Sequence, residues 1–235
     1  MKAMTAGERF EIEGRRICVC GDPSAERWVI LPVDGRELDG PENGPERIFG
    51  MLPEPETAMA AVEVLDWNAE LTPWRTDDVP GRNGFDGRAS ELLQLLEEKI
   101  LPELERGYCA AQKKRILAGY SLAGLFALWA CSKSGGFSAA AAMSPSVWYP
   151  GWLQFAEENR IRAEAVYLSL GDREEKTKNR LMASVGDAIR QQYRILQDSG
   201  ICCTLEWNPG NHFQNTEKRI AAGIAWSLQT IRSQE

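Results

Sequence analysis

Short apolar runs alternate with longer amphipathic segments along this chain, a pattern typical of a parallel sheet flanked by helices. Near the start, Phe10–Ile12 and Arg15–Cys20 are separated by Glu13-Gly14 and predict an antiparallel hairpin. Further strands are expected at Trp28–Val33, Ala58–Leu65, Arg115–Ala118, Phe137–Met143, Ala165–Leu170 and Ile201–Trp207. The pattern predicts an α/β fold whose mostly parallel sheet has about eight strands.

Helices are expected between these strands. Leucines and an isoleucine recur at helical spacing over Ser90–Glu105, and Pro102 should kink that helix or mark its last turn. The other expected helices are residues 43–51, Leu122–Cys131, Asn179–Gln197 closed by Gly200, and Thr216–Ile231 with Asn215 as a candidate cap.

Residues 66–87 are rich in Trp, Pro, Gly, Asn and Asp, and they predict a long surface loop of the kind that usually carries function. We find no internal repeat, no interdomain linker and no segment for a large cap domain. One domain over residues 1–235 is therefore expected.

Composition and charge narrow the range of partners. The chain is 43% hydrophobic and 26% charged, with a net charge of −7 and no basic run, which argues against nucleic acid or an anionic membrane as partner. The first residues lack the apolar region of a signal peptide, and no stretch is long enough to span a membrane. We expect a cytoplasmic protein that acts on a small molecule, and a homo-oligomer is left open.

Six cysteines are present, and their spacing fits neither a disulfide framework nor a CxxC metal site. Buried, reduced thiols are the expected state, and neither a metal nor another cofactor is expected. The cysteines are Cys18, Cys20, Cys109, Cys131, Cys202 and Cys203.

The strongest chemical signal is Ser121, which stands between a predicted strand and a predicted helix in Gly119-Tyr-Ser-Leu-Ala-Gly124. This context is typical of a nucleophile elbow, where a sharp turn exposes the serine and a glycine two residues earlier avoids a collision. The fifth position of the motif is Ala123 rather than glycine. A loop serine that caps the following helix is the other interpretation.

The only histidine, His212, lies between the last predicted strand and the last helix, where α/β hydrolases place the catalytic base. The acid should follow the preceding strand, and that loop contains three carboxylates. Spacing favours Glu174, with Asp172 and Glu175 as the alternatives.

An oxyanion hole needs two backbone N–H groups. Leu122, directly after the serine, should supply one, and Arg36, in the loop after Trp28–Val33, should supply the other. Tyr120, Trp67, Trp74 and Trp148 are candidate substrate contacts, although the tryptophans would equally anchor their loops.

The chain resembles the esterase branch of the α/β hydrolases, which includes enterochelin esterases, esterase D and mycolyltransferases. The matching segments are Val33-Asp-Gly35, Asp66–Trp74, Gly119-Tyr-Ser-Leu122, Ser144-Pro-Ser-Val-Trp148, Ser169-Leu-Gly171 and Gly210-Asn-His-Phe213. The resemblance implies an α/β-hydrolase fold and a serine esterase that forms an acyl-enzyme. A thioesterase, an acyltransferase or a non-catalytic binding module on the same scaffold are the alternatives.

Overall fold

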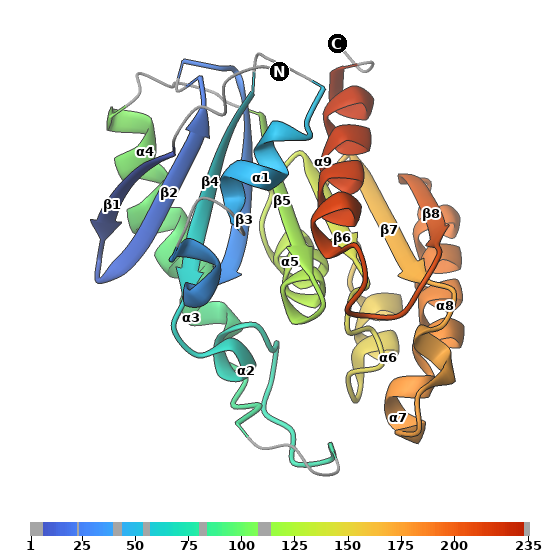
Figure 1. The fold of residues 1–235 in the computed structure, drawn as a ribbon. Coiled ribbons are helices and arrows are strands. Elements are labelled where there is room, and N and C mark those ends of the chain that lie inside the picture. Colours follow the sequence, from blue (N-terminus) through green and yellow to red (C-terminus); the bar gives the residue numbers. More distant parts are fainter. Residues whose placement is uncertain are drawn as a thin grey trace.

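A computed structural model describes residues 7–22, 24–39, 44–53, 57–79, 84–107 and 114–232 of the chain. The described strands form one eight-stranded sheet in the order β1-β2-β4-β3-β5-β6-β7-β8 (Figure 1). β1 and β2 form the predicted antiparallel hairpin, β2 pairs antiparallel with β4, and the remaining pairs are parallel. The strands are β1 (Glu8–Ile12), β2 (Arg15–Gly21), β3 (Arg27–Asp34), β4 (Thr57–Val64), β5 (Lys114–Tyr120), β6 (Ala139–Met143), β7 (Ala165–Gly171) and β8 (Cys202–Asn208).

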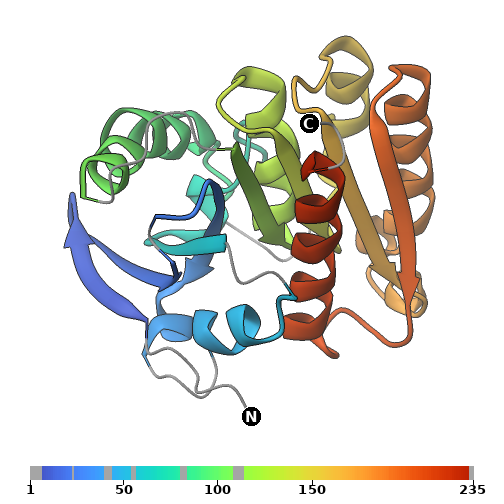
Figure 2. The same ribbon diagram turned by 90° about the horizontal axis from the view of Figure 1, so that it is seen from above.

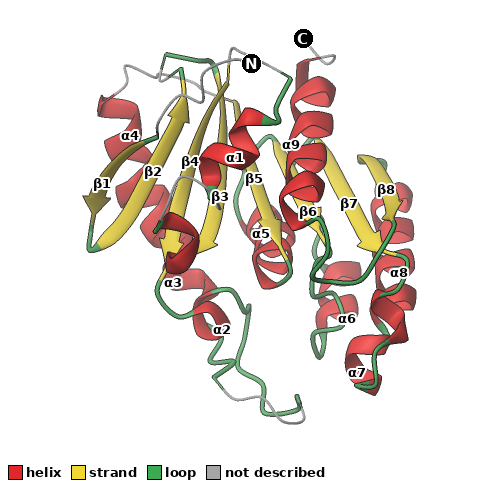
Figure 3. Cartoon of the chain, viewed as in Figure 1, coloured by secondary structure: helices red, strands yellow, loops and turns green. Residues whose placement is uncertain are grey.

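Helices cover both faces of this sheet (Figures 2 and 3). α1 (Pro45–Gly50) and α9 (Thr216–Arg232) lie on one face. The opposite face carries α3 (Ala89–Leu95), α4 (Leu101–Gly107), α5 (Leu122–Lys133), α6 (Trp152–Glu158) and α8 (Val185–Asp198). The short helices α2 (Trp67–Glu70) and α7 (Arg180–Ala183) belong to the connections that follow β4 and β7. The α/β-hydrolase fold expected from the sequence is confirmed. None of the described helices is both long and apolar enough to cross a membrane.

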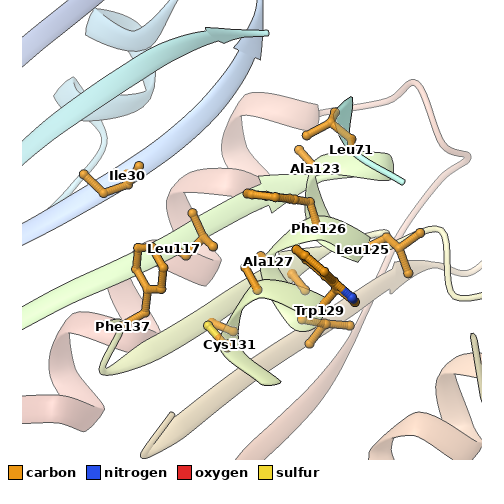
Figure 4. Packing of buried hydrophobic residues seen from close by; sticks show 14 of the residues in the cluster. Ile30, Leu71, Leu117, Ala123, Leu125, Phe126, Ala127, Trp129, Cys131 and Phe137 are labelled. Atoms are coloured by element: carbon orange, nitrogen blue, oxygen red, sulfur yellow. The ribbon is translucent and has the colours of Figure 1, made fainter. Parts of the chain in front are cut away.

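α5 occupies the centre of the larger hydrophobic layer (Figure 4). Leu125, Phe126 and Ala127 are fully buried, and Leu117 of β5 and Ile30 of β3 belong to the same cluster. A helix that is apolar on every side must be enclosed, because each exposed face would cost hydrophobic free energy. This packing fixes the start of α5, and therefore the position of the residue before it.

Part of the expected loop over residues 66–87 is ordered and buried instead. Asp66 caps α2 by accepting a hydrogen bond from the Ala69 N–H (3.1 Å), and Leu71 and Phe85 are buried in the core. The large apolar side chains of this segment are what hold it against the domain. Residues 80–83 lie outside the described part of the chain, as do Asn43 and Cys109.

Three helix expectations also need correction. The helical segment does not end at Pro102 but continues to Gly107, and a π-helical turn at Leu96–Ile100 precedes the proline between α3 and α4. The long helix expected after β7 is divided at Ser184 into α7 and α8. α6 was not predicted. It is short, and Gly151 at its start has a φ of 80° and offers no capping side chain.

Candidate active site

Ser121 stands at the turn from β5 into α5 with φ 60° and ψ −120°, a backbone conformation that a non-glycine residue rarely adopts. Its side chain makes no capping hydrogen bond to the helix, so the capping interpretation is not what the geometry favours. The turn needs glycine two residues earlier: a Cβ on Gly119 would overlap the carbonyl group of Ala123. The Ser121 N–H donates to Met143 O (3.0 Å), which ties the turn to β6.

His212 lies in the connection between β8 and α9 and contacts this serine, although the two residues are far apart in the sequence. Its Nε2 lies 3.0 Å from Ser121 Oγ, and its Nδ1 lies 2.7 Å from Glu174 Oε2. The three side chains thus form a continuous hydrogen-bonded series with the imidazole in the middle. A carboxylate at Nδ1 holds the ring in the tautomer whose Nε2 can accept a proton from the serine hydroxyl.

Glu174 is 8% exposed and is held by donors on both oxygens. Its Oε1 accepts from Gly171 N–H (2.7 Å), Ser144 Oγ (2.6 Å) and Arg219 Nη2 (2.7 Å). Burial alone would raise its pKa, but the hydrogen bonds from His212, Ser144 and Arg219 outweigh that cost and hold the pKa at about 2. The group is therefore a carboxylate at neutral pH.

The two other acids of this loop face elsewhere. Asp172 Oδ1 accepts a hydrogen bond from the Gly210 N–H (2.8 Å), and Glu175 pairs with Arg190 (3.3 Å). Asp172 therefore contacts the backbone of the histidine loop, the connection between β8 and α9 that carries His212, but not the imidazole itself. Glu175 links its own turn to α8. Of the three candidates, Glu174 alone contacts the His212 ring among the described residues.

Sequence reasoning missed two residues that organise this site, Ser144 and Arg219. Arg219, on α9, donates from Nε to Asn208 Oδ1 (2.9 Å) and from Nη1 to Asn211 O (3.4 Å), and it also contacts Ser144 Oγ. Ser144 follows β6 with a φ of 44°. Its place in the Ser144–Trp148 motif was the only signal available, and Arg219 gave none.

Tyr120 faces the histidine loop rather than open space. Its hydroxyl donates to His212 O (2.9 Å), and the two rings lie 5.2 Å apart between centroids. Burial raises the pKa of Tyr120 to about 12, so the phenol stays protonated and remains a donor. Its contacts are those of a residue that positions His212.

A cavity of about 190 Å³ opens beside Ser121 and His212. Trp148 contributes to its wall, together with Met182 and Phe213, which is 84% exposed. Two cationic residues, Arg173 and Lys176, also line it. The structure thus brings one of the three expected tryptophans to the serine.

The other two tryptophans lie in packing positions. Trp74 Nε1 donates to Pro150 O (3.0 Å), and its ring stacks at a tilt against Tyr149 and Phe155. Trp67 is half-buried on α2 against the larger hydrophobic layer. For Trp74 the contacts are those of a loop anchor.

Of the two expected oxyanion donors, Leu122 is the first residue of α5, so its N–H belongs to the unsatisfied first turn of a helix. Arg36 lies in the 3-10 turn Gly35–Leu38 after β3. Its N–H donates to Asp34 Oδ1 (2.9 Å) within a capping box. That hydrogen bond occupies the Arg36 N–H in this structure.

Comparison with known proteins identifies the family of the chain. A family model described as "Putative esterase" matches residues 62–201, more than half of the chain, and that span contains Ser121 and Glu174. No curated protein sequence matches the chain significantly.

Several solved structures share the fold. An IroE-like serine hydrolase from Shewanella oneidensis is 16% identical, with a TM-score of 0.77 over 94% of this chain and 79% of that one. The siderophore hydrolase EstB from Aspergillus nidulans is 15% identical, with a TM-score of 0.73 over 97% and 96% of the two chains. Enterochelin esterase from Shigella flexneri is 16% identical, with a TM-score of 0.68 over 98% of this chain and 59% of its own length. With the family match, these findings identify the chain as a member of the putative esterase family and as a carboxylic ester hydrolase.

Proposed function

We propose that the protein cleaves a carboxylic ester of a small molecule through an acyl-enzyme intermediate. Ser121 is the nucleophile, His212 the general base and Glu174 the residue that orients the imidazole. The observation that carries the proposal is the series Ser121 Oγ to His212 Nε2 (3.0 Å) and His212 Nδ1 to Glu174 Oε2 (2.7 Å). Both distances lie within hydrogen-bond reach, which general base catalysis requires.

In the proposed mechanism, Ser121 Oγ attacks the ester carbonyl while its proton moves to His212 Nε2. The imidazolium that forms is stabilised by the Glu174 carboxylate, which keeps its own charge throughout. His212 then gives the proton to the departing alcohol. In the second half, water attacks the acyl-enzyme and His212 again takes the proton. The bond between Ser121 Oγ and the acyl carbon then breaks, His212 returns the proton to Ser121 Oγ, and the carboxylic acid is released.

Charge develops on the carbonyl oxygen during both attacks, and backbone N–H groups are the proposed donors to it. Leu122, at the start of α5, is the first. The Arg36 N–H is the second donor that the sequence favours, and it becomes available only if Asp34 releases its hydrogen bond of 2.9 Å.

The cavity supports a substrate with an apolar or aromatic part. Trp148, Met182 and Phe213 provide apolar surface, and Arg173 and Lys176 place positive charge at the same wall. We infer that the substrate also presents an anionic or electron-rich oxygen there. Because fold neighbours are described as siderophore hydrolases and an enterochelin esterase, siderophore esters belong among the compounds to test.

Labelling with a fluorophosphonate probe tests the nucleophile, and hydrolysis of p-nitrophenyl acyl esters, thioesters and siderophore esters tests the substrate class. We expect one covalent adduct, on Ser121, and turnover of oxygen esters. Ser146→Ala is a matched control, because its hydroxyl lies 3.5 Å from Ser121 Oγ. An adduct elsewhere, or turnover confined to thioesters, would contradict the proposal.

A further inference from the structure

A second cluster of chemically reactive side chains lies on β2 and α1. Cys18 and Cys20 project from the same face of β2, because side chains two residues apart on a strand share a face. Their sulfur atoms are 3.9 Å apart, and Cys18 Sγ lies 3.7 Å from Oε1 of Glu46 on α1. The three residues are 0%, 1% and 3% exposed, and their ligand atoms all lie within 4.8 Å of one another.

The carboxylate of this cluster is only partly satisfied. Glu46 Oε1 is paired with Arg9 Nη2 at 2.5 Å, whereas Oε2 is buried and has no hydrogen-bond partner among the described residues. A buried carboxylate oxygen without a partner is costly unless something positive binds it. Gly7 closes the cluster from the side: a Cβ there would overlap Cys18 Sγ and would lie 3.1 Å from Glu46 Oε1.

We propose that Cys18, Cys20 and Glu46 form a binding site for a thiophilic divalent metal ion, with Zn²⁺ as the best fit. Thiolates and a carboxylate are ordinary zinc ligands, and three protein ligands leave one tetrahedral position for water. Zinc–sulfur bonds of about 2.3 Å at a tetrahedral angle place two sulfurs about 3.8 Å apart. The observed separation of 3.9 Å matches that requirement without movement of the strand.

A disulfide is the competing use of two neighbouring thiols, and the geometry disfavours it. Residues two apart on a strand have Cα atoms about 6.6 Å apart, near the upper limit of disulfide geometry. The sulfurs would also have to close from 3.9 Å to a bond length of about 2.0 Å. The strand is held on both sides, by β1 and β4, which opposes that distortion.

Charge and protons balance for a dication. The balance starts from two thiols and from the ion pair of Glu46 with Arg9, which is neutral as a unit. Binding of Zn²⁺ releases two thiol protons to solvent, so two thiolates, one carboxylate, the ion and the Arg9 guanidinium together carry no net charge. A buried site of this kind would otherwise pay a large cost for its charges.

The proposed site is separate from Ser121. Cys18 pairs with Ala61 in the middle of β4 and Cys20 with Met59 nearer its start, whereas the serine lies beyond the carboxyl end of β5. A metal here would link α1 to β2 and act on stability rather than on ester cleavage. The proposal therefore does not depend on the proposed function.

Cobalt substitution tests the site in the full-length, reduced and metal-stripped protein. We expect one equivalent of Co²⁺ to bind and to give thiolate-to-cobalt charge-transfer absorption with the visible bands of tetrahedral coordination, and Zn²⁺ to displace it. Cys18→Ser and Cys20→Ser should each abolish the charge-transfer band. Glu46→Gln should weaken binding by more than the roughly 10- to 100-fold that loss of an outer-sphere partner costs.

Two controls keep the outcome decisive. The double variant Cys202→Ser, Cys203→Ser removes thiols on β8, and His212→Gln removes the only histidine; both should keep the cobalt band. Gly7→Ala keeps every ligand but places a methyl group against Cys18 Sγ and Glu46 Oε1. It should weaken Co²⁺ binding while the far-ultraviolet circular dichroism stays that of the wild type. A wild-type protein without the band, or a band that survives Cys18→Ser or is lost with Cys202 and Cys203, would overturn the proposal.

Discussion

The guanidinium of Arg219 lies 2.7 Å from Oε1 of Glu174, the carboxylate oxygen that does not face His212. The two side chains are 3% and 4% exposed, so this ion pair is almost entirely shielded from water. Arg219 therefore fixes the acid while the acid fixes the imidazole. Because it reaches the proposed nucleophile only through Glu174 and His212, we regard Arg219 as a positioning residue.

Arg219→Met should destabilise the fold and lower kcat. Removing one partner of a buried ion pair costs about 3–5 kcal/mol, because the other charge is left without compensation. KM should change little, since Arg219 is not among the residues that line the described cavity. Urea unfolding and the kinetics of a short activated ester measure the two effects.

The conservative variant Arg219→Lys separates charge from geometry. A lysine keeps the positive charge but cannot reproduce the contacts to Glu174, Ser144 and Asn208 from one planar group. We expect partial recovery of stability and less recovery of kcat. If Arg219→Met kept wild-type kcat, the positioning role would be wrong.

Ser121→Ala should lower the rate of ester hydrolysis by several orders of magnitude while the fold stays intact. Loss of the nucleophile leaves only binding and oxyanion contacts to promote the reaction. Ser146→Ala, which removes a neighbouring hydroxyl, should cost about tenfold at most, because that hydroxyl only approaches Ser121 Oγ at 3.5 Å. Steady-state rates with a p-nitrophenyl ester provide the comparison. Half the wild-type rate in Ser121→Ala would assign the nucleophile elsewhere.

The three acids after β7 should differ sharply. Glu174→Gln should lower kcat by on the order of 10² to 10⁴, because an amide at Nδ1 favours the wrong tautomer and cannot stabilise the imidazolium. Asp172→Asn should be milder, since Asp172 meets only the Gly210 backbone of the histidine loop, and Glu175→Gln milder still. Equal losses of kcat in all three variants would contradict the assignment of Glu174 as the acid that orients His212.

Most of the sheet could be predicted because its inner strands are buried on both faces and are therefore continuously apolar, as in β3 and β7. The missed and divided helices depend on packing that periodicity does not report. α6 begins at Gly151 without a capping side chain and is held by Trp152, which is buried and donates to Gln192 (2.8 Å).

The candidate site was predictable to the extent that chain order dictates it. Ser121 and His212 follow strands whose carboxyl ends meet at one edge of the sheet, so spacing along the chain identifies them. The choice among the acids depends on the 3-10 turn Glu174–Lys176, which sequence spacing can rank but not resolve. The role of Arg219 could not be recognised from the sequence. An arginine in an amphipathic helix is usually solvated, and only the tertiary structure shows that this one is buried.

Gly119→Ala should disrupt the turn that presents Ser121. The added Cβ would overlap the Ala123 carbonyl group, which is backbone and cannot rotate away, so β5 and α5 would have to separate. We expect a loss of activity together with a fall in Tm. Gly135→Ala is the matched control, because nothing lies within 4 Å of its added Cβ. An active, wild-type-like Gly119→Ala protein would contradict the elbow geometry.

Acid should weaken the fold in part through Glu174. Its pKa falls from the ordinary 4.5 to about 2 in the folded protein, because the hydrogen bonds of His212, Ser144 and Arg219 overcome the cost of burial. A depressed carboxyl pKa stabilises the fold above the unfolded value, and that contribution disappears as the pH falls toward the folded value. The full contribution is about 3 kcal/mol, of which about 2 kcal/mol is lost by pH 3.

Glu174→Gln removes this contribution, because a glutamine does not titrate. The pKa values of Asp34 and Glu63 are also lowered, by hydrogen bonds from Arg36 and Arg16 respectively. Both groups are present in the wild type and in Glu174→Gln, so their contributions to the free energy of unfolding cancel in the comparison. Between pH 6 and pH 3, the free energy of unfolding in urea should therefore fall by about 2 kcal/mol more in the wild type than in Glu174→Gln. Parallel curves would mean that Glu174 has the same pKa in the folded and unfolded chains, and the network around its Oε1 would then not hold it as a carboxylate.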